Sequence, residues 1–385
     1  MIPYSRQIIT KDDKKKVNSV LGSNFITQGR LLEKFENKLA YKVDAKYSTG
    51  FNSATSALHI ACLALGVKKG DIVWTCTNSF VASANCALYC GAKVDLVDVS
   101  NDNFNISIKD LEKKLVIAKK KKKLPKVLIP VHFGGTPCDL EKIYKLSKKY
   151  KFKIIEDASH AIGAKYKGEK IGSCKYSEIT VFSFHPVKII TTGEGGAALT
   201  NNKQLDQKLK MLRNHGITRD RRYLKKKKLP SWYYEFQELG FNYRLNEIQS
   251  ALGISQLKKL NKWVKYRNAL ANTYRRELKK LPIYIPPKKK GYYSSHHLFV
   301  ITIKKNLRNL NRDNIFEILK KNKIQSNVHY IPIHSHPFYK KIGFTNKAFP
   351  EATKYFNSCL SLPLYAGLTK KNQKKIINVL KKNLL

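Results

Sequence analysis

Between residues 47 and 200, short runs of apolar and β-branched residues alternate with segments of helical periodicity. The runs expected to form strands are 71–76, 94–99, 126–131, 152–157, 179–184 and 196–200. Helices are expected near 54–65, 80–90, 107–118, 139–150 and 203–213. Continuous apolar strands separated by helices are typical of a largely parallel sheet that is covered on both faces. The sequence therefore predicts an α/β architecture, with functional residues at the carboxyl ends of the strands.

The pattern changes after Pro230. A long helical segment, 245–278, has one apolar face, and a strand-like run at 297–303 and a helix near 312–322 follow it. We expect residues 1–249 to form a large α/β domain with an N-terminal arm. Residues 250–385 are expected to form a smaller α+β domain, joined to the first by the long helix.

The chain carries 74 Lys and Arg residues against 27 Asp and Glu, a formal net charge of +47. Such a balance raises the hypothesis of a nucleic-acid-binding protein, because basic surfaces release counterions from phosphates. However, the lysines are spread along the whole chain, and no zinc finger, helix-turn-helix or aromatic-basic RNA-binding signature accompanies them. A general lysine bias that makes solvated faces is the favoured interpretation, and the charge would also attract an anionic small substrate.

The seven cysteines are an odd number and include no Cys-x-x-Cys pair, so we expect free, buried thiols in a reducing compartment and no metal site. The first residues, MIPYSRQIIT, lack the apolar stretch of a signal peptide. No apolar run approaches the ~20 residues that a membrane helix needs. The sequence predicts a cytoplasmic protein.

The segment 51-FNSATSALHIACLALG-66 places small hydroxyl residues between a strand and a helix. The amino end of a helix favours a phosphate, because its first N–H groups are free to donate and the helix dipole is positive there. Thr55 and Ser56 are therefore candidate phosphate ligands. An ordinary helix cap remains the alternative, since Ser and Thr cap many helices.

Two further stretches carry candidate residues. Asp157 ends the strand 152–157, and a buried carboxylate there stays ionised only beside a cation, such as a protonated pyridine nitrogen. His160 follows it closely. Phe80, at the expected start of a helix, would offer a flat face to a planar ring. Helix capping for Asp157 and His160 and core packing for Phe80 are the alternatives.

Lys188 stands in 182-FSFHPVKIITTGEGG-196, bracketed by apolar residues and followed by threonines and glycines. A free lysine amine, with a pKa of ~10.4, is a poor nucleophile at neutral pH unless desolvation lowers that pKa. The apolar bracket supplies desolvation, which suits a lysine that forms a Schiff base. Ser183 would add a phosphate hydroxyl. A phosphate turn, an aromatic face, a strand-end Asp and a desolvated Lys together match what pyridoxal 5'-phosphate requires.

With these motifs the chain resembles the sugar-nucleotide aminotransferases of the DegT/DnrJ/EryC1/StrS family. The resemblance spans nearly the whole chain, and the Lys188 and Arg244 motifs are highly specific for the family. The matching segments are NFITQGRLLEKFE (24–36), FNSATSALH (51–59), SFVASANCAL (79–88), EDASHAIGAKYKGEKIGS (156–173), VFSFHPVKIITTGEGGAALTN (181–201), NHGI (214–217), GFNYRLNEIQSALGISQL (240–257) and VHYIPIH (328–334).

The resemblance implies a fold-type I pyridoxal-phosphate transferase, similar to aspartate aminotransferase, whose large domain binds the cofactor. It implies that Lys188 is the catalytic Schiff-base residue, that Asp157 pairs with the pyridinium nitrogen, and that Phe80 stacks on the ring with His160 beside it. Further roles are implied by the same motifs. Thr55, Ser56 and Ser183 would hold the phosphate, and Asn242 would reach the phosphate of the neighbouring subunit of a homodimer. Substrate contacts would come from Tyr4, Asn24, Phe25, Ile26, Thr27, Ala54, Asn327, Val328, His329 and Tyr330.

Within the family, the sequence looks most like the branch that acts in pseudaminic acid biosynthesis. Many relatives have Asn-Gly-Thr at the phosphate turn where this chain has Asn52, Ser53, Ala54 and Thr55, a departure that favours this branch. The branch transfers the amino group of L-glutamate to a UDP-linked 4-keto-6-deoxy-N-acetylhexosamine, giving UDP-4-amino-4,6-dideoxy-N-acetyl-beta-L-altrosamine. Pyridoxamine phosphate carries the amino group between the half-reactions. The alternatives are an aminotransferase for a dTDP- or GDP-linked keto sugar, and a non-catalytic basic binding protein.

Overall fold

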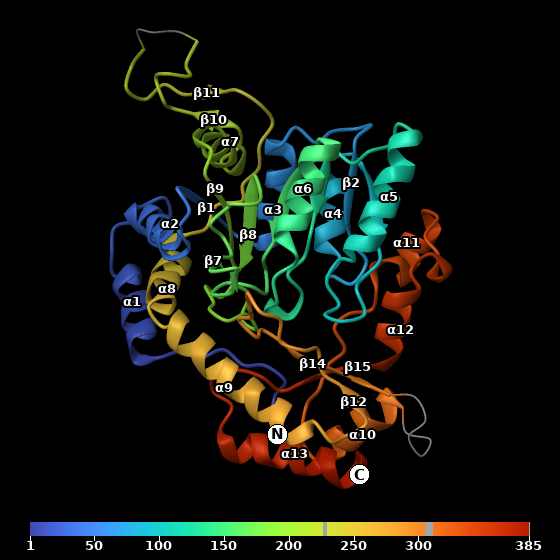
Figure 1. Ribbon diagram of the computed structural model, residues 1–385. Coiled ribbons are helices and arrows are strands. Elements are labelled where there is room, and N and C mark those ends of the chain that lie inside the picture. Colours follow the sequence, from blue (N-terminus) through green and yellow to red (C-terminus); the bar gives the residue numbers. More distant parts are fainter. Residues whose placement is uncertain (226–228, 305–310, 385) are drawn as a thin grey trace.

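The computed structural model describes residues 1–225, 229–304 and 311–384. Its largest sheet has seven strands in the upper half of the molecule (Figure 1). In spatial order these strands are β1 (Tyr47–Phe51), β9 (Gly196–Thr200), β8 (Ile179–Ser183), β5 (Lys153–Asp157), β4 (Val127–Ile129), β2 (Ile72–Cys76) and β3 (Lys93–Val97). The six strands predicted from the sequence are confirmed, and β1 is added at one edge.

Neighbouring strands from β3 to β8 pair in parallel, whereas β9 runs antiparallel to both β8 and β1. The predicted, largely parallel sheet is therefore confirmed. Because β5 and β8 are parallel neighbours, with Asp157 in register with Val181, their carboxyl ends meet at the same edge. That edge receives both Asp157 and Ser183.

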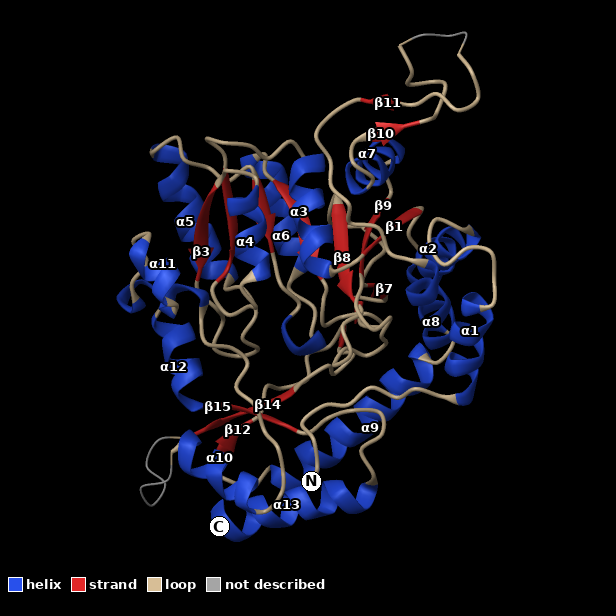
Figure 2. Ribbon diagram, turned by 180° about the vertical axis from the view of Figure 1, so that it is seen from behind, coloured by secondary structure: helices blue, strands red, loops and turns tan. Residues whose placement is uncertain are grey.

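Helices cover both faces of this sheet (Figures 1 and 2). One group contains α3 (Ala54–Ala64), α4 (Ala82–Tyr89) and α7 (Lys203–Arg213), and the other contains α5 (Ile108–Lys120) and α6 (Leu140–Tyr150). Helices α1 (Lys11–Leu21), α2 (Arg30–Val43) and α8 (Glu247–Leu257) form a separate group beside β1. Two-sided cover explains why the strands are apolar along their length rather than alternating.

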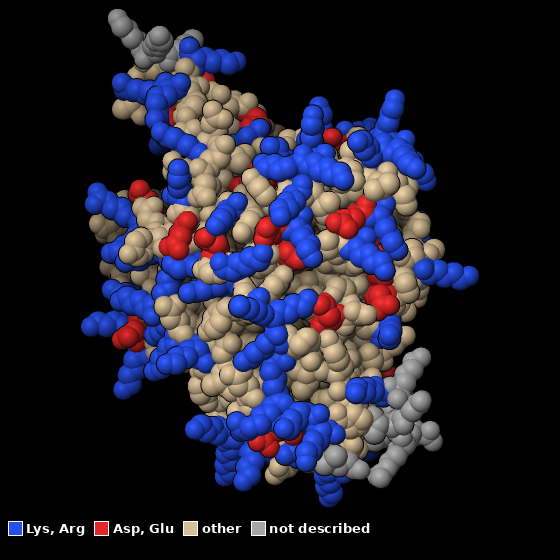
Figure 3. Space-filling model, in the orientation of Figure 1, with Lys and Arg blue, Asp and Glu red and all other residues tan. Residues whose placement is uncertain are grey.

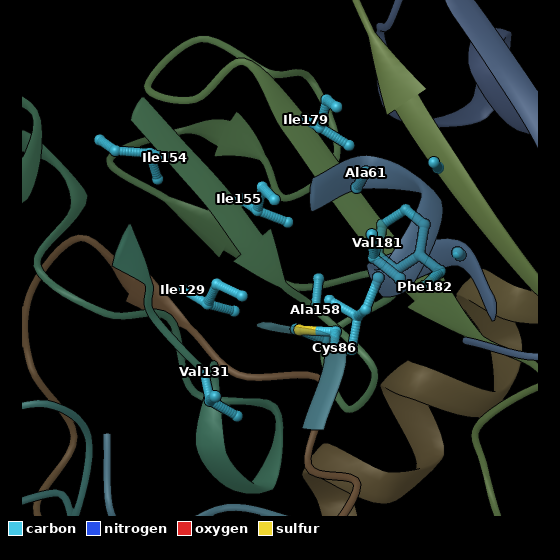
Figure 4. Close-up of a cluster of buried hydrophobic side chains, with 14 of the residues drawn as sticks. Ala61, Cys86, Ile129, Val131, Ile154, Ile155, Ala158, Ile179, Val181 and Phe182 are labelled. Atoms are coloured by element: carbon cyan, nitrogen blue, oxygen red, sulfur yellow. The ribbon is translucent and has the colours of Figure 1, made fainter. Parts of the chain in front are cut away.

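The core between the layers is formed by branched aliphatic side chains. Figure 4 shows Ile155 of β5 and Ile179 and Val181 of β8 near Ala61 of α3 and Cys86 of α4. All five are fully buried. Each buried side chain of the Val or Ile type contributes about 1.5–3 kcal/mol relative to an exposed one. This core therefore fixes the two strands whose ends carry the candidate site.

The remaining elements lie mainly below the large sheet in Figure 1. A three-stranded antiparallel sheet, in the order β12 (Ile283–Tyr284), β14 (Phe299–Ile303) and β15 (Cys359–Leu362), is central to this part. The helices are α9 (Leu260–Leu278), α10 (Arg312–Lys321), α11 (Pro337–Lys341), α12 (Pro350–Ser358) and α13 (Lys370–Leu384). The strand-like run and the helix expected at 297–303 and 312–322 are thus confirmed.

The prediction of one long helix over 245–278 is wrong, since the segment forms α8 and α9 with a break at Lys258 and Lys259. The two helices serve different parts of the molecule. Helix α8 packs against α1 and α2, whereas the far half of α9 packs in a second hydrophobic cluster through Leu270 and Tyr274. The periodicity of the sequence continues through the break because Leu257 and Leu260 are both buried.

The division between clusters falls inside α9: Val264 belongs to the core of the large sheet and Leu270 to the second cluster. Ile2 also belongs to the second cluster, so the first residues cross to that part of the chain. The predicted division into 1–249 and 250–385 stays a prediction.

Two small sheets complete the fold. One consists of β13 (Tyr292–Tyr293), β6 (Lys165–Tyr166) and β7 (Glu169–Lys170), and it joins a late segment of the chain to the large-sheet half. The other, β10 (Ile217–Thr218) with β11 (Glu235–Phe236), lies in an arm that projects from the body (Figure 1).

Charge and thiols follow the expected distribution. On the face in Figure 3, lysine and arginine side chains are scattered among acidic ones rather than gathered into one stripe. All seven cysteines are free, as predicted. In the ranges that the structure describes, no helix combines the length and apolarity needed to cross a bilayer.

Candidate active site

Lys188 lies in the loop between β8 and β9, where its amide donates to the carbonyl of His185 at 2.9 Å. The following Ile189 and Ile190 are buried, and Lys188 itself is half-buried. The N-terminal segment supports this loop, because Ser5 Oγ donates to the carbonyl of Val187 at 3.1 Å. Burial lowers the pKa of Lys188 to about 8, while the nearby Asp157 acts in the opposite direction. The structure thus bears out the expectation of a desolvated amine.

Asp157 is the last residue of β5 and is 4% exposed. Its Oδ1 accepts from the amide of Ser159 at 3.1 Å, and its Oδ2 accepts from Ser83 Oγ at 2.6 Å. Sequence reasoning missed Ser83, although 79-SFVASAN-85 places two small hydroxyl residues, Ser79 and Ser83, four positions apart. Two of the carboxylate's lone-pair positions are used, so others remain for a ligand.

His160, also predicted from the sequence, is buried next to Tyr330. Its Nδ1 accepts from the amide of Gly134 at 3.3 Å, and its Nε2 lies 3.0 Å from the Tyr330 hydroxyl. Burial, with help from Lys188, lowers the pKa of His160 well below its usual range. In the neutral ring the proton must therefore lie on Nε2 and point to Tyr330, which leaves the hydroxyl proton of Tyr330 free to donate elsewhere.

His329 and Tyr4 form the opposite side of this group. Their rings lie 5.7 Å apart, and burial raises the pKa of Tyr4 while the neighbouring Asn327 side chain acts in the opposite direction. His329 Nδ1 lies 2.8 Å from Ser361 Oγ, and burial together with Lys188 lowers the pKa of His329 to about 3. Burial also raises the pKa of Tyr330. The structure therefore brings residues 4, 157, 160, 188, 327, 329 and 330 together as one polar cluster with a single cationic amine.

His297 was not predicted, yet its ring lies 4.3 Å from the ring of His160. Burial lowers its pKa well below the usual range, and its Nδ1 is buried without a hydrogen-bond partner among the described residues. The buried Arg267 donates to the carbonyls of His296, His297 and Leu364. No sequence signal marked either residue, because only the tertiary fold brings the 296–297 segment to His160.

Phe80 lies at the mouth of this cluster, with its ring centroid 6.2 Å from that of Tyr330. It is 59% exposed, which is unusual for a phenylalanine with only a packing role. The expected position at the start of a helix is wrong by two residues, because α4 begins at Ala82. The aromatic ring is thus free to cover a planar ligand.

The predicted phosphate turn lies where β1 leads into α3. Ser53 caps α3, its Oγ accepting from the amide of Ser56 at 3.1 Å, and Ser56 Oγ donates to Asn52 Oδ1 at 2.6 Å. Gly196 of β9 passes directly against this turn and is in register with Ser183 of β8. Ser183 and the amino end of α3, which includes Ala54 and Thr55, therefore face the same place. The N-cap of α3 is Ser53, so neither Thr55 nor Ser56 has the capping role that was the alternative for them.

Two groups of predicted residues lie apart from this cluster within one chain. Asn24–Thr27 are exposed, and the amide of Glu247 donates to the carbonyl of Ile26 at 3.1 Å. Phe25 and Ile26 are 62% and 55% exposed. Asn242 is also exposed and pairs with Asn214, while the carbonyl of its neighbour Tyr243 accepts from the amide of Asn52 at 2.9 Å.

These residues fit pyridoxal phosphate by their chemistry. The lowered pKa of Lys188 suits a nucleophilic amine, and Asp157 is a buried carboxylate with free lone pairs. Gly196 leaves room at the amino end of α3, which a Cβ would fill. Metal binding has no such support, since no group of three or more His, Cys, Asp or Glu among the described residues could hold an ion.

A parallel sheet that presents a strand-end carboxylate, a desolvated lysine and a phosphate turn at one edge defines a transferase of pyridoxal-phosphate fold-type I. Residues 7–381 match the model of the DegT/DnrJ/EryC1/StrS aminotransferase family. The chain belongs to this family and is an aminotransferase, as the sequence motifs predicted.

Relatives agree over the full length. The chain is 39% identical over 381 residues to the UDP-4-amino-4,6-dideoxy-N-acetyl-beta-L-altrosamine transaminase of Campylobacter jejuni, covering 99% of this chain and 96% of that protein. The structure of Helicobacter pylori PseC, an aminotransferase involved in the biosynthesis of pseudoaminic acid, matches with a TM-score of 0.91 at 34% identity, covering 100% and 99% of the two chains.

A third match is the putative sugar aminotransferase Spr1654 of Streptococcus pneumoniae in its PMP form, with a TM-score of 0.90, 28% identity and coverage of 99% and 98%. The fold-type prediction is confirmed by these structures. Aminotransferases of this family use pyridoxal phosphate, so the predicted cofactor is confirmed at the level of the family.

Proposed function

We propose that this protein transfers the amino group of L-glutamate to C4 of a UDP-linked 4-keto-6-deoxy-N-acetylhexosamine, giving UDP-4-amino-4,6-dideoxy-N-acetyl-beta-L-altrosamine. The observation that carries the transfer chemistry is the half-buried Lys188 amine, whose pKa is lowered to about 8 beside Asp157. The sugar nucleotide rests on the full-length similarity to the Campylobacter jejuni transaminase. The amino donor rests on the family resemblance alone.

The residues proposed to contact the cofactor have distinct tasks. Pyridoxal phosphate, when bound, supplies the electron sink that allows an amino group to leave one carbon and enter another. Lys188 Nζ would hold the cofactor and, once released from it, would accept and return the proton of the substrate carbon. Asp157 holds a proton on the ring nitrogen, because a buried carboxylate stabilises a cation next to it.

The histidines around Lys188 keep the positive charge of the site on the amine. With its pKa lowered to about 3, His329 stays neutral at physiological pH, and His160 is neutral for the same reason. Neutral His160 orients the Tyr330 hydroxyl so that it donates into the site. Tyr330 is thereby a hydrogen-bond donor for a substrate oxygen, in line with its proposed place among the substrate contacts with Tyr4, Asn327 and Val328.

The phosphate of the cofactor would lie at the amino end of α3 with Thr55, Ser56 and Ser183. Free N–H groups in the first turn and the helix dipole both favour an anion there. Phe80 would cover the ring. The net charge of +47 supplies a long-range attraction for the anionic diphosphate of a nucleotide sugar. Location in the cytoplasm stays a prediction.

The test is a panel of keto-sugar nucleotides supplied with L-glutamate, followed by mass spectrometry of the product and NMR assignment of the new stereocentre. We expect turnover with the UDP-4-keto-6-deoxy-N-acetylhexosamine and an L-altro product. Preference for a GDP- or dTDP-linked sugar would contradict the proposed substrate without affecting the aminotransferase class.

We further propose that the active unit is a homodimer whose sites are shared. The exposed Phe25 and Ile26, together with Asn242, lie outside the Lys188 cluster of their own chain, which is where residues that complete a neighbour's site would be found. Large exposed apolar side chains that lie next to each other are typical of protein interfaces.

Complementation tests this arrangement. In a hybrid of a Lys188→Ala chain with an Asn242→Ala chain, one site has both Lys188 and the partner's asparagine intact. If sites are shared, mixing the inactive Lys188→Ala variant with the weakened Asn242→Ala variant after partial denaturation restores activity in that site. Absence of recovery, with hybrid dimers demonstrated by native mass spectrometry, would place both residues in the same site.

A further inference from the structure

Ser83 and Ser79 form a chain of buried hydroxyl groups that ends on Asp157. Ser79 Oγ lies 2.7 Å from Ser83 Oγ, and Ser83 Oγ lies 2.6 Å from Asp157 Oδ2. Both serines are almost fully buried, with Ser83 at 0% exposure. Water therefore does not compete with these hydrogen bonds. The roles predicted for the site residues do not explain why two buried hydroxyl groups lie here.

The donor and acceptor in each of these hydrogen bonds follow from the chemistry of the Asp157 carboxylate. An ionised carboxylate only accepts hydrogen bonds, so Ser83 must donate its single proton to Asp157. Ser83 Oγ is then the acceptor in its contact with Ser79, and Ser79 is the donor. Hydrogen bonds that point the same way polarise one another, which strengthens the last bond on the carboxylate.

We propose that Ser83, oriented by Ser79, is a positioning residue that fixes the rotamer of the Asp157 carboxylate toward the ring nitrogen of the cofactor. Ser83 occupies Oδ2, while the amide of Ser159 contacts Oδ1 from the loop that follows β5. These two donors leave the carboxylate one orientation. The inference rests on the proposed role of Asp157 as the partner of that nitrogen.

Loss of the Ser83 hydroxyl has a defined consequence for the proton between Asp157 and the ring. Without this donor, only the Ser159 amide holds the Asp157 carboxylate, which is then free to rotate away from the ring nitrogen. A carboxylate that has turned away stabilises the proton on the ring nitrogen less. Asp157 would then hold that proton less firmly, and Lys188 would remove the proton of the amino-acid carbon more slowly.

The experiment uses the dimeric holoenzyme loaded with pyridoxal phosphate labelled with ¹⁵N in the ring. We expect Ser83→Ala to move the ¹⁵N resonance toward the value of the unprotonated ring, and Ser79→Ala to move it less in the same direction. Ser83→Thr, which keeps the hydroxyl, restores the native value. Because Ser83→Ala loses a hydrogen bond to a charged group, we expect its kcat to fall about tenfold or more, with KM little changed.

Several outcomes separate this inference from the proposed function. A Ser83→Ala holoenzyme with the native ¹⁵N resonance overturns the positioning role, even if its Tm or activity is lower, because packing alone would account for that loss. Asp157→Asn serves as the reference: if it leaves the resonance unchanged, the role of Asp157 is itself wrong. Ser19→Ala, at an exposed hydroxyl of α1, controls for the loss of a serine and is expected to leave every value native.

Discussion

Gly196 lies so close to Ala54 that a Cβ on the glycine would stand 2.5 Å from the Ala54 amide nitrogen. Gly196 lies on β9 and Ala54 in the first turn of α3, next to the predicted phosphate ligands Thr55 and Ser56. A contact this short involves backbone atoms, which cannot move aside as a flexible side chain would. The glycine thus allows β9 and α3 to meet next to Ser183.

Gly196→Ala is expected to push α3 away from β9 and weaken cofactor binding. Overpacking of a buried contact costs roughly 1–3 kcal/mol, so a lower Tm of the apoenzyme should accompany a higher Kd for pyridoxal phosphate. Calorimetry and fluorescence titration measure the two effects. Gly22→Ala is the control, because a Cβ there meets no atom closer than 3.9 Å. Native affinity in Gly196→Ala would contradict the proposed phosphate site.

Lys188→Ala should abolish transamination while the fold survives. The half-buried lysine lies in a loop between strands and contributes no apolar area to the core. Activity with L-glutamate and a keto-sugar nucleotide, together with circular dichroism, checks both parts of this prediction. Lys354→Ala, at an exposed lysine of α12, should keep native turnover. Residual turnover in purified Lys188→Ala protein would refute the Schiff-base assignment.

The pH dependence of cofactor capture follows from the pKa of about 8 at Lys188. Only the neutral amine attacks the aldehyde, and its fraction increases with pH up to that pKa. The rate at which apoenzyme forms the Schiff base should therefore rise about tenfold per unit below pH 8 and level off above it. Stopped-flow absorbance gives this profile. A rate that continues to climb toward pH 10 would indicate a solvated lysine with an ordinary pKa.

Asp157→Asn should retain the cofactor but slow the reaction severely. An amide cannot hold a positive charge on the ring nitrogen, so the loss should fall on kcat rather than on KM for glutamate. Retention is expected because Lys188 and the phosphate turn remain intact. Isotope effects with glutamate deuterated at the α-carbon should increase as proton transfer becomes rate-limiting. An unchanged rate would remove Asp157 from the mechanism.

The sequence predicted the strands of the large sheet well because helices cover both of its faces, so the apolar runs of β2, β3, β4, β5, β8 and β9 are nearly continuous. Lys188, Asp157 and Ser183 were proposed as site residues for the same reason, since each stands at or near the end of such a run. The break between α8 and α9 was missed because Leu257 and Leu260 keep the helical pattern on both sides of it. The spacing of apolar residues does not reveal that the packing partners change between α8 and α9, where the chain bends.

Other parts of the site required the tertiary structure. Ser83 looks like any small residue at the start of a helix until its Oγ is seen 2.6 Å from Asp157. His297 lies on a segment distant in sequence from His160, and only the fold brings their rings together. The residues 24–27 and Asn242 were predicted from family motifs, and the proposed homodimer assigns them to the site of a neighbouring subunit.

The contact of Tyr4 with His329 joins the beginning of the chain to a segment near its end. During synthesis, Asp157 and Lys188 leave the ribosome well before His329 and Tyr330 exist. The side of the site that is proposed to receive the substrate is therefore the last part of it to be made.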